Sequence, residues 1–176
     1  STGKALASAT SPDKELDIIA RQIGWAEQHT DTWWQHVKNA TQQIKAKAKF
    51  DPADVKAIGI SYQMHGLVVI DKNKNVLRPS IIWCDSRAVP MGRQASQQIG
   101  SRKCLENLLN LPGNFTASKL KWVKDNEPEI YSKIHKIMLP GDYIAMKMTD
   151  QITTTQSGLS EMILWDFKND KLADWV

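Results

Sequence analysis

The sequence of 176 residues has no long apolar run and only two cysteines. No stretch approaches the roughly 20 apolar residues that a membrane-spanning helix needs, and we expect no signal peptide in residues 1–15. Cys84 and Cys104 form no CxxC pair, so neither a zinc site nor a disulfide framework is indicated. Two thiols without an export signal predict a reducing, cytoplasmic setting and no membrane partner.

Several motifs of catalysis and nucleotide binding are also missing. The sequence contains no GxxxxGK[ST] and no GxGxxG, so it offers no nucleotide-binding loop of either type. Neither GxSxG nor HExxH occurs, which argues against the hydrolases that those motifs mark. The chain has no internal repeat and no low-complexity segment, and its length suits one domain.

The basic charge is spread along the chain. The formal net charge is +4 and the pI is about 9.0, but only residues 45–49 carry a dense run of lysines. This run is typical of the solvated C-terminal end of a helix, where positive charge is favourable. Since no aromatic residues are interleaved with it, we predict no nucleic-acid partner.

The rest of the chain is organised around residues 56–87, which contain three short apolar runs. Residues 57–60, 67–70 and 81–83 have the composition of buried strands. The polar segment 71–75 predicts a hairpin turn between two of them.

Mostly polar residues follow the first and the third apolar run. Gln63, Met64 and His65 come after the first run, and Cys84 and Asp85 after the third. Ligands bind at strand ends in α/β sheets. We therefore expect this stretch to form half of a small-molecule site.

The remaining pattern predicts an α/β fold with a mixed sheet. Short strands are expected at 5–9 and 16–20, after a turn at 1–4, and a loop at 24–29. A helix of about 18 residues follows a Thr30–Asp31 N-cap. Later elements are helices at 90–99, 102–111, 142–148 and from 127, a helix capped by Thr116 or Ser118, a strand at 137–139, extended segments at 152–155 and 161–167, and a helix beginning at 170.

Each candidate site residue also has a structural interpretation. His65 could hydrogen-bond a polar ligand or be satisfied by neighbouring backbone, and the residue alone favours the second. Trp83 could pack in the core or form an aromatic wall for a sugar. Asp85 could pair with Arg87 or contact hydroxyl groups.

Two further groups are ambiguous. Trp25, Trp33 and Trp34 could form a sugar platform, although Trp34 lies on the apolar stripe of its helix and favours the core. Lys119 and Trp122 share one helix face, and we expect the lysine stem to pack along the indole.

Six stretches of the sequence carry a recognisable pattern. They are Gly24–Gln28 with Trp33–Trp34, Ser61–Gly66, Val76–Pro79, Ile82–Arg87, Asn114–Val123 and Leu139–Thr149. Taken together and in this order, they resemble the N-terminal domain of the FGGY family of carbohydrate kinases, and the segment at 63–66 is similar to the xylulokinase branch.

The resemblance implies an actin-like, ribonuclease-H-like domain and ATP-dependent phosphorylation of a sugar hydroxyl, with D-xylulose as the expected substrate. ATP and Mg²⁺ would serve the complete enzyme. The resemblance implies sugar contacts by Met64, His65 and Trp83, and Gln63 lies beside these residues. Asn114 matches a substrate-contacting position of the glycerol kinases, and Asp85 lies in a family motif and is a further candidate.

No catalytic residue is assigned within the chain. The resemblance implies that the general-base aspartate lies beyond Val176, the last residue of the sequence. The family's phosphate-binding hairpin and second domain are likewise expected to lie outside residues 1–176.

The sequence also departs from the family pattern. Cys84 stands where Asn is frequent, Gly141 where Lys is usual, and Asp150–Gln151 replaces Gly-Glu.

Two other functions stay open. The first is a kinase of the same family for ribulose, gluconate or glycerol, although Met64–His65 differs from the Arg-Glu pair of glycerol kinases. The second is a non-catalytic sugar-binding module, because a fold does not fix a function.

An isolated 176-residue product is expected to lack kinase activity, because it would carry only part of the sugar site. We also expect it to be loosely folded or to form a homodimer through an unpaired sheet edge. ATP-dependent sugar phosphorylation by the purified chain, or a sharp two-state thermal transition of a monomer, would contradict these expectations.

Overall fold

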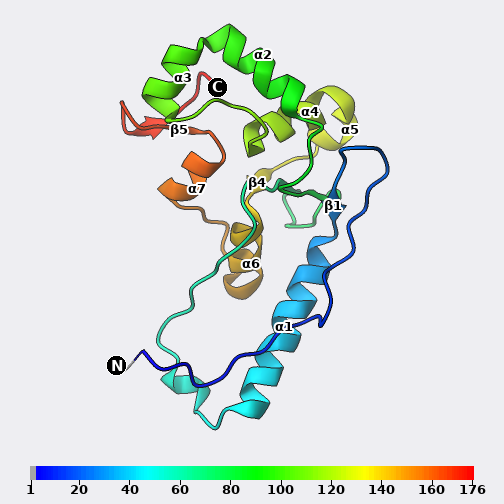
Figure 1. The fold of residues 1–176 in the computed structure, drawn as a ribbon, viewed down its shortest axis with the longest axis vertical. Coiled ribbons are helices and arrows are strands. Elements are labelled where there is room, and N and C mark those ends of the chain that lie inside the picture. Colours follow the sequence, from blue (N-terminus) through cyan, green and yellow to red (C-terminus); the bar gives the residue numbers. More distant parts are fainter. Residues whose placement is uncertain (1–2) are drawn as a thin grey trace.

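The computed structural model describes residues 3–176, and most of its strands lie between two layers of helices (Figure 1). The predicted turn at 1–4 falls partly outside the described residues. The helices are α1 (Thr30–Lys47), α2 (Val89–Ile99), α3 (Ser101–Leu108), α4 (Thr116–Asn126), α5 (Pro128–Tyr131), α6 (Pro140–Thr149) and α7 (Gln156–Glu161), with a 3₁₀ turn, η1, at Pro52–Asp54.

The strands are short and pair antiparallel. They are β1 (Glu27–Gln28), β2 (Val68–Ile70), β3 (Ser80–Ile81), β4 (Lys136–Met138), β5 (Trp165–Asp166) and β6 (Lys171–Leu172). β1 pairs with β3, β2 with β4 and β5 with β6, and a bridge between Leu67 and Ile81 joins the first two ladders. The predicted mixed sheet is therefore wrong for the described strands, whose pairings are all antiparallel.

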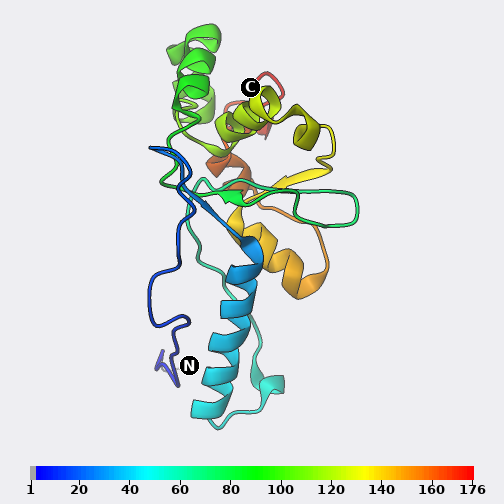
Figure 2. The same cartoon turned by 90° about the vertical axis from the view of Figure 1, so that its right-hand side faces the viewer.

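Alternation along β2 creates the two cores. Successive side chains of a strand point to opposite faces. Leu67 and Val69 pack on one face with Trp122 of α4, whereas Val68 and Ile70 pack on the other face with α6. Figure 2 shows the strands between the green helices above and the blue and gold helices α1 and α6 below.

The predicted hairpin turn at 71–75 is confirmed. The Asp71 carboxylate accepts hydrogen bonds from the main-chain N–H groups of Asn73 and Asn75, both at 2.8 Å. A bridge between Ile70 and Val76 closes the turn. An aspartate that binds its own turn in this way is the chemistry expected from the sequence.

Two of the three central runs form strands, and the prediction for 57–60 is wrong. This segment has no regular structure, and Ile58 is 69% exposed. A strand needs a hydrogen-bonding neighbour, and within residues 3–176 no strand lies beside this segment. The segments 5–9 and 16–20 are likewise irregular, apart from a bridge between Ile19 and Glu27.

Several other boundaries also differ from the predictions. The expected loop at 24–29 contains β1, because Glu27 and Gln28 pair with β3. Of the extended segment predicted at 161–167, only Trp165–Asp166 forms a strand, β5, and β6 replaces the helix expected from 170. The helix N-caps are His29 and Phe115, one residue before the predicted Thr30 and Thr116.

The end of the chain is a turn rather than the beginning of a helix. After β6, the main-chain N–H of Val176 donates to the carbonyl oxygen of Ala173 at 3.1 Å. The neighbouring Trp175 packs against the small core formed by α3 and the segment around Ile163. This packing fixes residues 173–176 without further helical turns.

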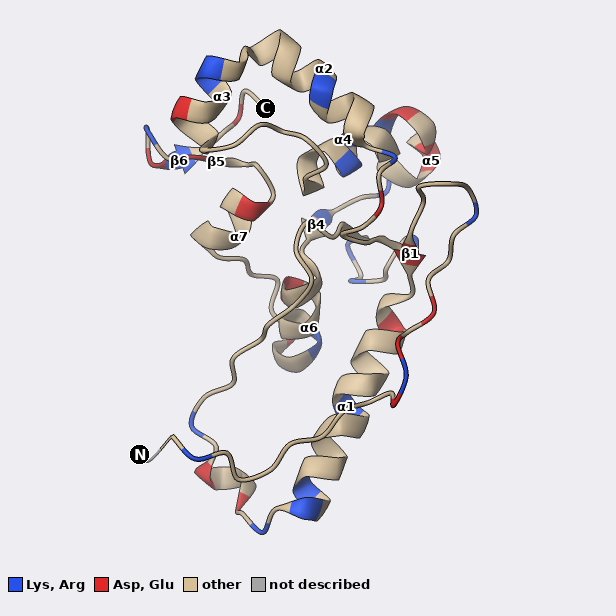
Figure 3. Ribbon diagram, in the orientation of Figure 1, with Lys and Arg blue, Asp and Glu red and all other residues tan. Residues whose placement is uncertain are grey.

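Charged groups lie over the whole fold rather than on one face (Figure 3). Lys45 and Lys47 occupy the last turn of α1 and are exposed, as predicted for a solvated helix end. In the described part of the chain, no helix is long and apolar enough to cross a membrane.

Gly92 permits the close approach of α2 to the turn before α4. A Cβ atom at this position would lie 1.7 Å from the carbonyl oxygen of Gly113. We predict that Gly92→Ala destabilises the protein by about 1–3 kcal/mol through overpacking, although alanine favours a helix interior by itself. Urea unfolding midpoints test this.

Gly59→Ala provides the matched control, since a Cβ there meets nothing within 4 Å. It should leave the midpoint unchanged or raise it slightly. A midpoint for Gly92→Ala at or above that of the unsubstituted protein would contradict the close approach.

Candidate sugar-binding site

A buried ion network fixes the end of β3, where the candidate site begins. Asp85 is fully buried, and its carboxylate accepts hydrogen bonds from the Arg87 guanidinium (2.7 Å) and the Ala26 amide (2.6 Å). Arg87 also donates to Glu27 at 2.7 Å. Its guanidinium carbon lies 3.8 Å from the ring centroid of Trp25, so the cation is held between carboxylates and an indole face.

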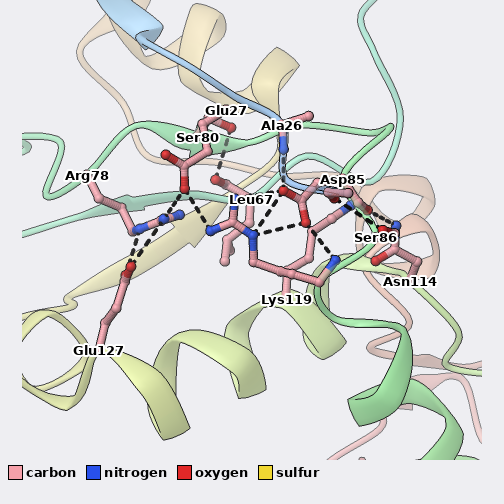
Figure 4. Close-up of polar contacts among 12 residues, drawn as sticks. Ala26, Glu27, Leu67, Arg78, Ser80, Asp85, Ser86, Asn114, Lys119 and Glu127 are labelled. Atoms are coloured by element: carbon pink, nitrogen blue, oxygen red, sulfur yellow. Dashed lines mark hydrogen bonds and ion pairs between the residues drawn. The ribbon is translucent and has the colours of Figure 1, made fainter. Parts of the chain in front are cut away.

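The network continues across the sheet to the end of α4 (Figure 4). Arg78 contacts Glu27 at 2.5 Å and Glu127 at 2.7 Å. Two guanidinium groups thus face three carboxylates, and the buried ammonium of Lys119 lies close enough to Asp85 to balance the charge. Because burying an unpaired charge is costly, removal of one partner should strongly destabilise this region.

Short contacts bring the segment before β2 and the segment after β3 together. Gln63 Oε1 accepts a hydrogen bond from the Trp83 amide at 3.1 Å. Asn114 Nδ2 donates to the carbonyl oxygen of Asp85. Both segments therefore converge, as predicted, although 20 residues separate Gln63 from Trp83.

Trp83 and Met64 are exposed apolar side chains at this point. Trp83 is 57% exposed and Met64 56%. The core-packing interpretation of Trp83 is therefore wrong. Exposed aromatic and thioether groups beside polar groups provide an apolar surface on which a ligand can pack.

His65 has a left-handed backbone conformation that charged groups stabilise. Its φ angle is 59°, which costs a non-glycine residue about 1–2 kcal/mol. The His65 N–H donates to Glu161 Oε1 at 2.8 Å, and Lys119 Nζ donates to the His65 carbonyl at 2.7 Å. Charge-assisted hydrogen bonds of this kind offset the strain.

The imidazole of His65 is partly enclosed. It packs edge-on against Phe115, with ring centroids 4.1 Å apart. Its Nδ1 atom is buried and has no hydrogen-bond partner within residues 3–176. Burial, and then the nearby Lys119, lower the pKa of His65 below its usual value, so the ring is neutral at pH 7 and its Nε2 can donate or accept a hydrogen bond.

Lys119 has a larger part in the site than the sequence indicated. Its side chain is fully buried, and burial lowers the pKa of the amine to about 8, partly offset by Asp85. The ammonium binds the His65 carbonyl and thus supports the loop that presents the imidazole. The prediction of a stem packed on Trp122 missed this, because residue spacing reveals no contact with a distant loop.

The tryptophans near β1 belong to the structure rather than to an open platform. Trp25 packs edge-on against Trp122 at 5.2 Å. Trp34 packs partly buried against the core on the α6 side, as predicted. Trp33 Nε1 donates to Gln28 at 3.0 Å and its ring meets Tyr143.

Side chains that could bind a metal ion do not cluster in the described part of the molecule. Among the described residues, no group of three or more His, Cys, Asp or Glu side chains could hold a metal ion. The general-base aspartate expected beyond Val176 stays a prediction.

Residues 2–175 match the model of the FGGY family of carbohydrate kinases, N-terminal domain. The chain belongs to the FGGY family.

Named relatives agree with this. The chain is 37% identical to a xylulose kinase of Escherichia coli (strain K12) over 155 residues, which are 88% of this chain and 31% of that protein. The crystal structure of a xyloylose kinase from Brucella ovis matches with a TM-score of 0.81 at 30% identity, covering 90% of this chain and 33% of that one. The chain spans about a third of the length of these relatives.

A more distant structural match supports the fold alone. The gluconate kinase of Lactobacillus acidophilus has a TM-score of 0.82 at 21% identity and covers 92% of this chain and 33% of that one. The fold is therefore shared by kinases named for different substrates.

Substitutions in the ion network should reduce the stability of the protein more than other substitutions in this region. We predict that Arg87→Met costs about 3–5 kcal/mol of stability, because it leaves the buried Asp85 carboxylate without its guanidinium partner and Glu27 with Arg78 alone. The unfolding midpoint in urea measures the loss.

Arg102→Met serves as the control. Arg102 is 90% exposed and pairs with Glu106 on the same helix, so its replacement should cost less than about 1 kcal/mol. Equal midpoints for the two variants would contradict the importance assigned to the buried network.

Proposed function

We propose that this chain is the sugar-binding part of an ATP-dependent kinase that phosphorylates a hydroxyl group of a ketopentose. D-xylulose, giving xylulose 5-phosphate, is the substrate that we favour. The convergence of Gln63, His65, Trp83 and Asn114 at two strand ends carries the proposal. The similarity to xylulose kinases supports the choice of sugar.

The proposed site has an apolar wall and a polar wall. The indole of Trp83 and the side chain of Met64, both exposed, would cover the C–H face of the sugar. The neutral imidazole of His65 would hydrogen-bond a hydroxyl through Nε2. Such contacts hold the acceptor hydroxyl in place, which is a large part of phosphoryl-transfer catalysis.

Asp85 and Asn114 have different proposed roles. Both carboxylate oxygens of Asp85 accept hydrogen bonds from within the protein, so we propose that Asp85 supports the site rather than contacting the sugar. Asn114 binds the Asp85 carbonyl through Nδ2, and its Oδ1 has no partner among the described residues. Because this oxygen is buried, its contact with a sugar hydroxyl stays a prediction.

The other parts of the reaction belong to the proposed whole enzyme. ATP and Mg²⁺ would supply the phosphoryl group and neutralise its charge. An aspartate beyond Val176 would accept the hydroxyl proton. Action in the cytoplasm remains part of the proposal.

A panel of sugars tests this with the full-length protein that carries this domain. Xylulose, ribulose, gluconate and glycerol are supplied with ATP, and ADP release is measured. Xylulose should give the highest kcat/KM. Preference for another of these compounds would reassign the substrate, and phosphorylation of none would favour a non-catalytic sugar-binding module.

The His65→Ala variant tests the role of the imidazole. Loss of one hydrogen bond to the sugar should raise its KM about tenfold, while the KM for ATP stays unchanged. His135→Ala is the control, because His135 lies before β4 and its side chain is exposed. An unaltered sugar KM in His65→Ala would remove His65 from the site.

A further inference from the structure

Glu161 reaches the His65 loop from a distant part of the chain. It is the last residue of α7 and lies 96 positions after His65 in the sequence. One carboxylate oxygen, Oε1, accepts the His65 N–H at 2.8 Å. The other, Oε2, accepts the Tyr62 hydroxyl at 3.4 Å. A single carboxylate thus bridges two residues on either side of Met64 and Gln63.

Gly141 makes room for this arrangement. A Cβ atom on Gly141 would lie 2.1 Å from the Tyr62 ring, so the absence of a side chain there lets the ring lie against the start of α6. Burial, and then Glu161 and Asp142, raise the pKa of Tyr62 to about 12, so its hydroxyl keeps the proton that it donates.

The opposite side of the loop is equally fixed. Lys119 from α4 holds the His65 carbonyl at 2.7 Å. Next along the chain, a Cβ on Gly66 would lie 2.5 Å from Pro140. An anion therefore holds the N–H of His65, a cation holds its carbonyl, and Pro140 restricts the following residue.

We propose that Glu161 is a positioning residue for the sugar site. It fixes the left-handed conformation of His65 through the main chain and, with Tyr62 packed on Gly141, sets where the imidazole meets the sugar. The inference rests on the proposed function for its consequence in catalysis. The carboxylate does not contact the sugar, so its effect is on binding geometry.

The test compares Glu161→Ala with Glu161→Gln in the full-length protein. Alanine removes the acceptor for the His65 N–H and should raise the sugar KM about tenfold, with kcat and the KM for ATP within about twofold of the original. Glutamine keeps an oxygen acceptor and should restore the KM to within about threefold. Glu129→Ala, an exposed glutamate on α5, should change nothing.

A second readout does not depend on activity. Hydrogen exchange of the amides at 61–66 should be faster in Glu161→Ala than in Glu161→Gln, which should match the original protein. An unchanged sugar KM in Glu161→Ala, a KM in Glu161→Gln as high as in the alanine variant, or a loss confined to kcat would overturn the inference.

The two measurements also separate this inference from the proposed function. If the original protein phosphorylates none of the sugars, the proposed function fails. Hydrogen exchange of the amides at 61–66 then tests by itself whether Glu161 fixes the His65 loop. Faster exchange in the alanine variant only would then support the loop, and equal exchange in all variants would overturn it.

Discussion

The buried ion pair between Asp85 and Arg87 is the contact on which the candidate site depends. It joins the end of β3 to β1 through the Ala26 amide and Glu27. The same Asp85 residue accepts the Asn114 amide through its main chain. Three segments that are distant in sequence are therefore held by one group of charges, which must remain paired because they are removed from water.

Charged side chains also fix the main chain of His65. His65 is placed in a conformation that its side chain disfavours, with a carboxylate on its N–H and an ammonium on its carbonyl. A loop fixed on both sides can present an imidazole in one orientation. This matters for the proposed kinase, since an imidazole that is already held in position binds the sugar at a smaller entropic cost.

The sequence predicted what depends on local chemistry and missed what depends on distant neighbours. The 71–75 turn and α1 follow from side-chain chemistry within a few residues, and the structure has both. Residues 57–60 have the composition of a strand but no neighbouring strand to pair with in the described chain. Trp83 is a residue type that often packs in the core, but its side chain is exposed. No local pattern could connect Glu161 to His65, because 96 positions separate them.

We propose that a sugar binds where the segments after the first and third apolar runs converge. A crystal structure of the full-length protein with its sugar bound would reveal the contacts. We expect a sugar hydroxyl within hydrogen-bond distance of His65 Nε2, and the ring of Trp83 against the sugar's C–H face. A sugar bound elsewhere, with His65 and Trp83 open to solvent, would contradict it.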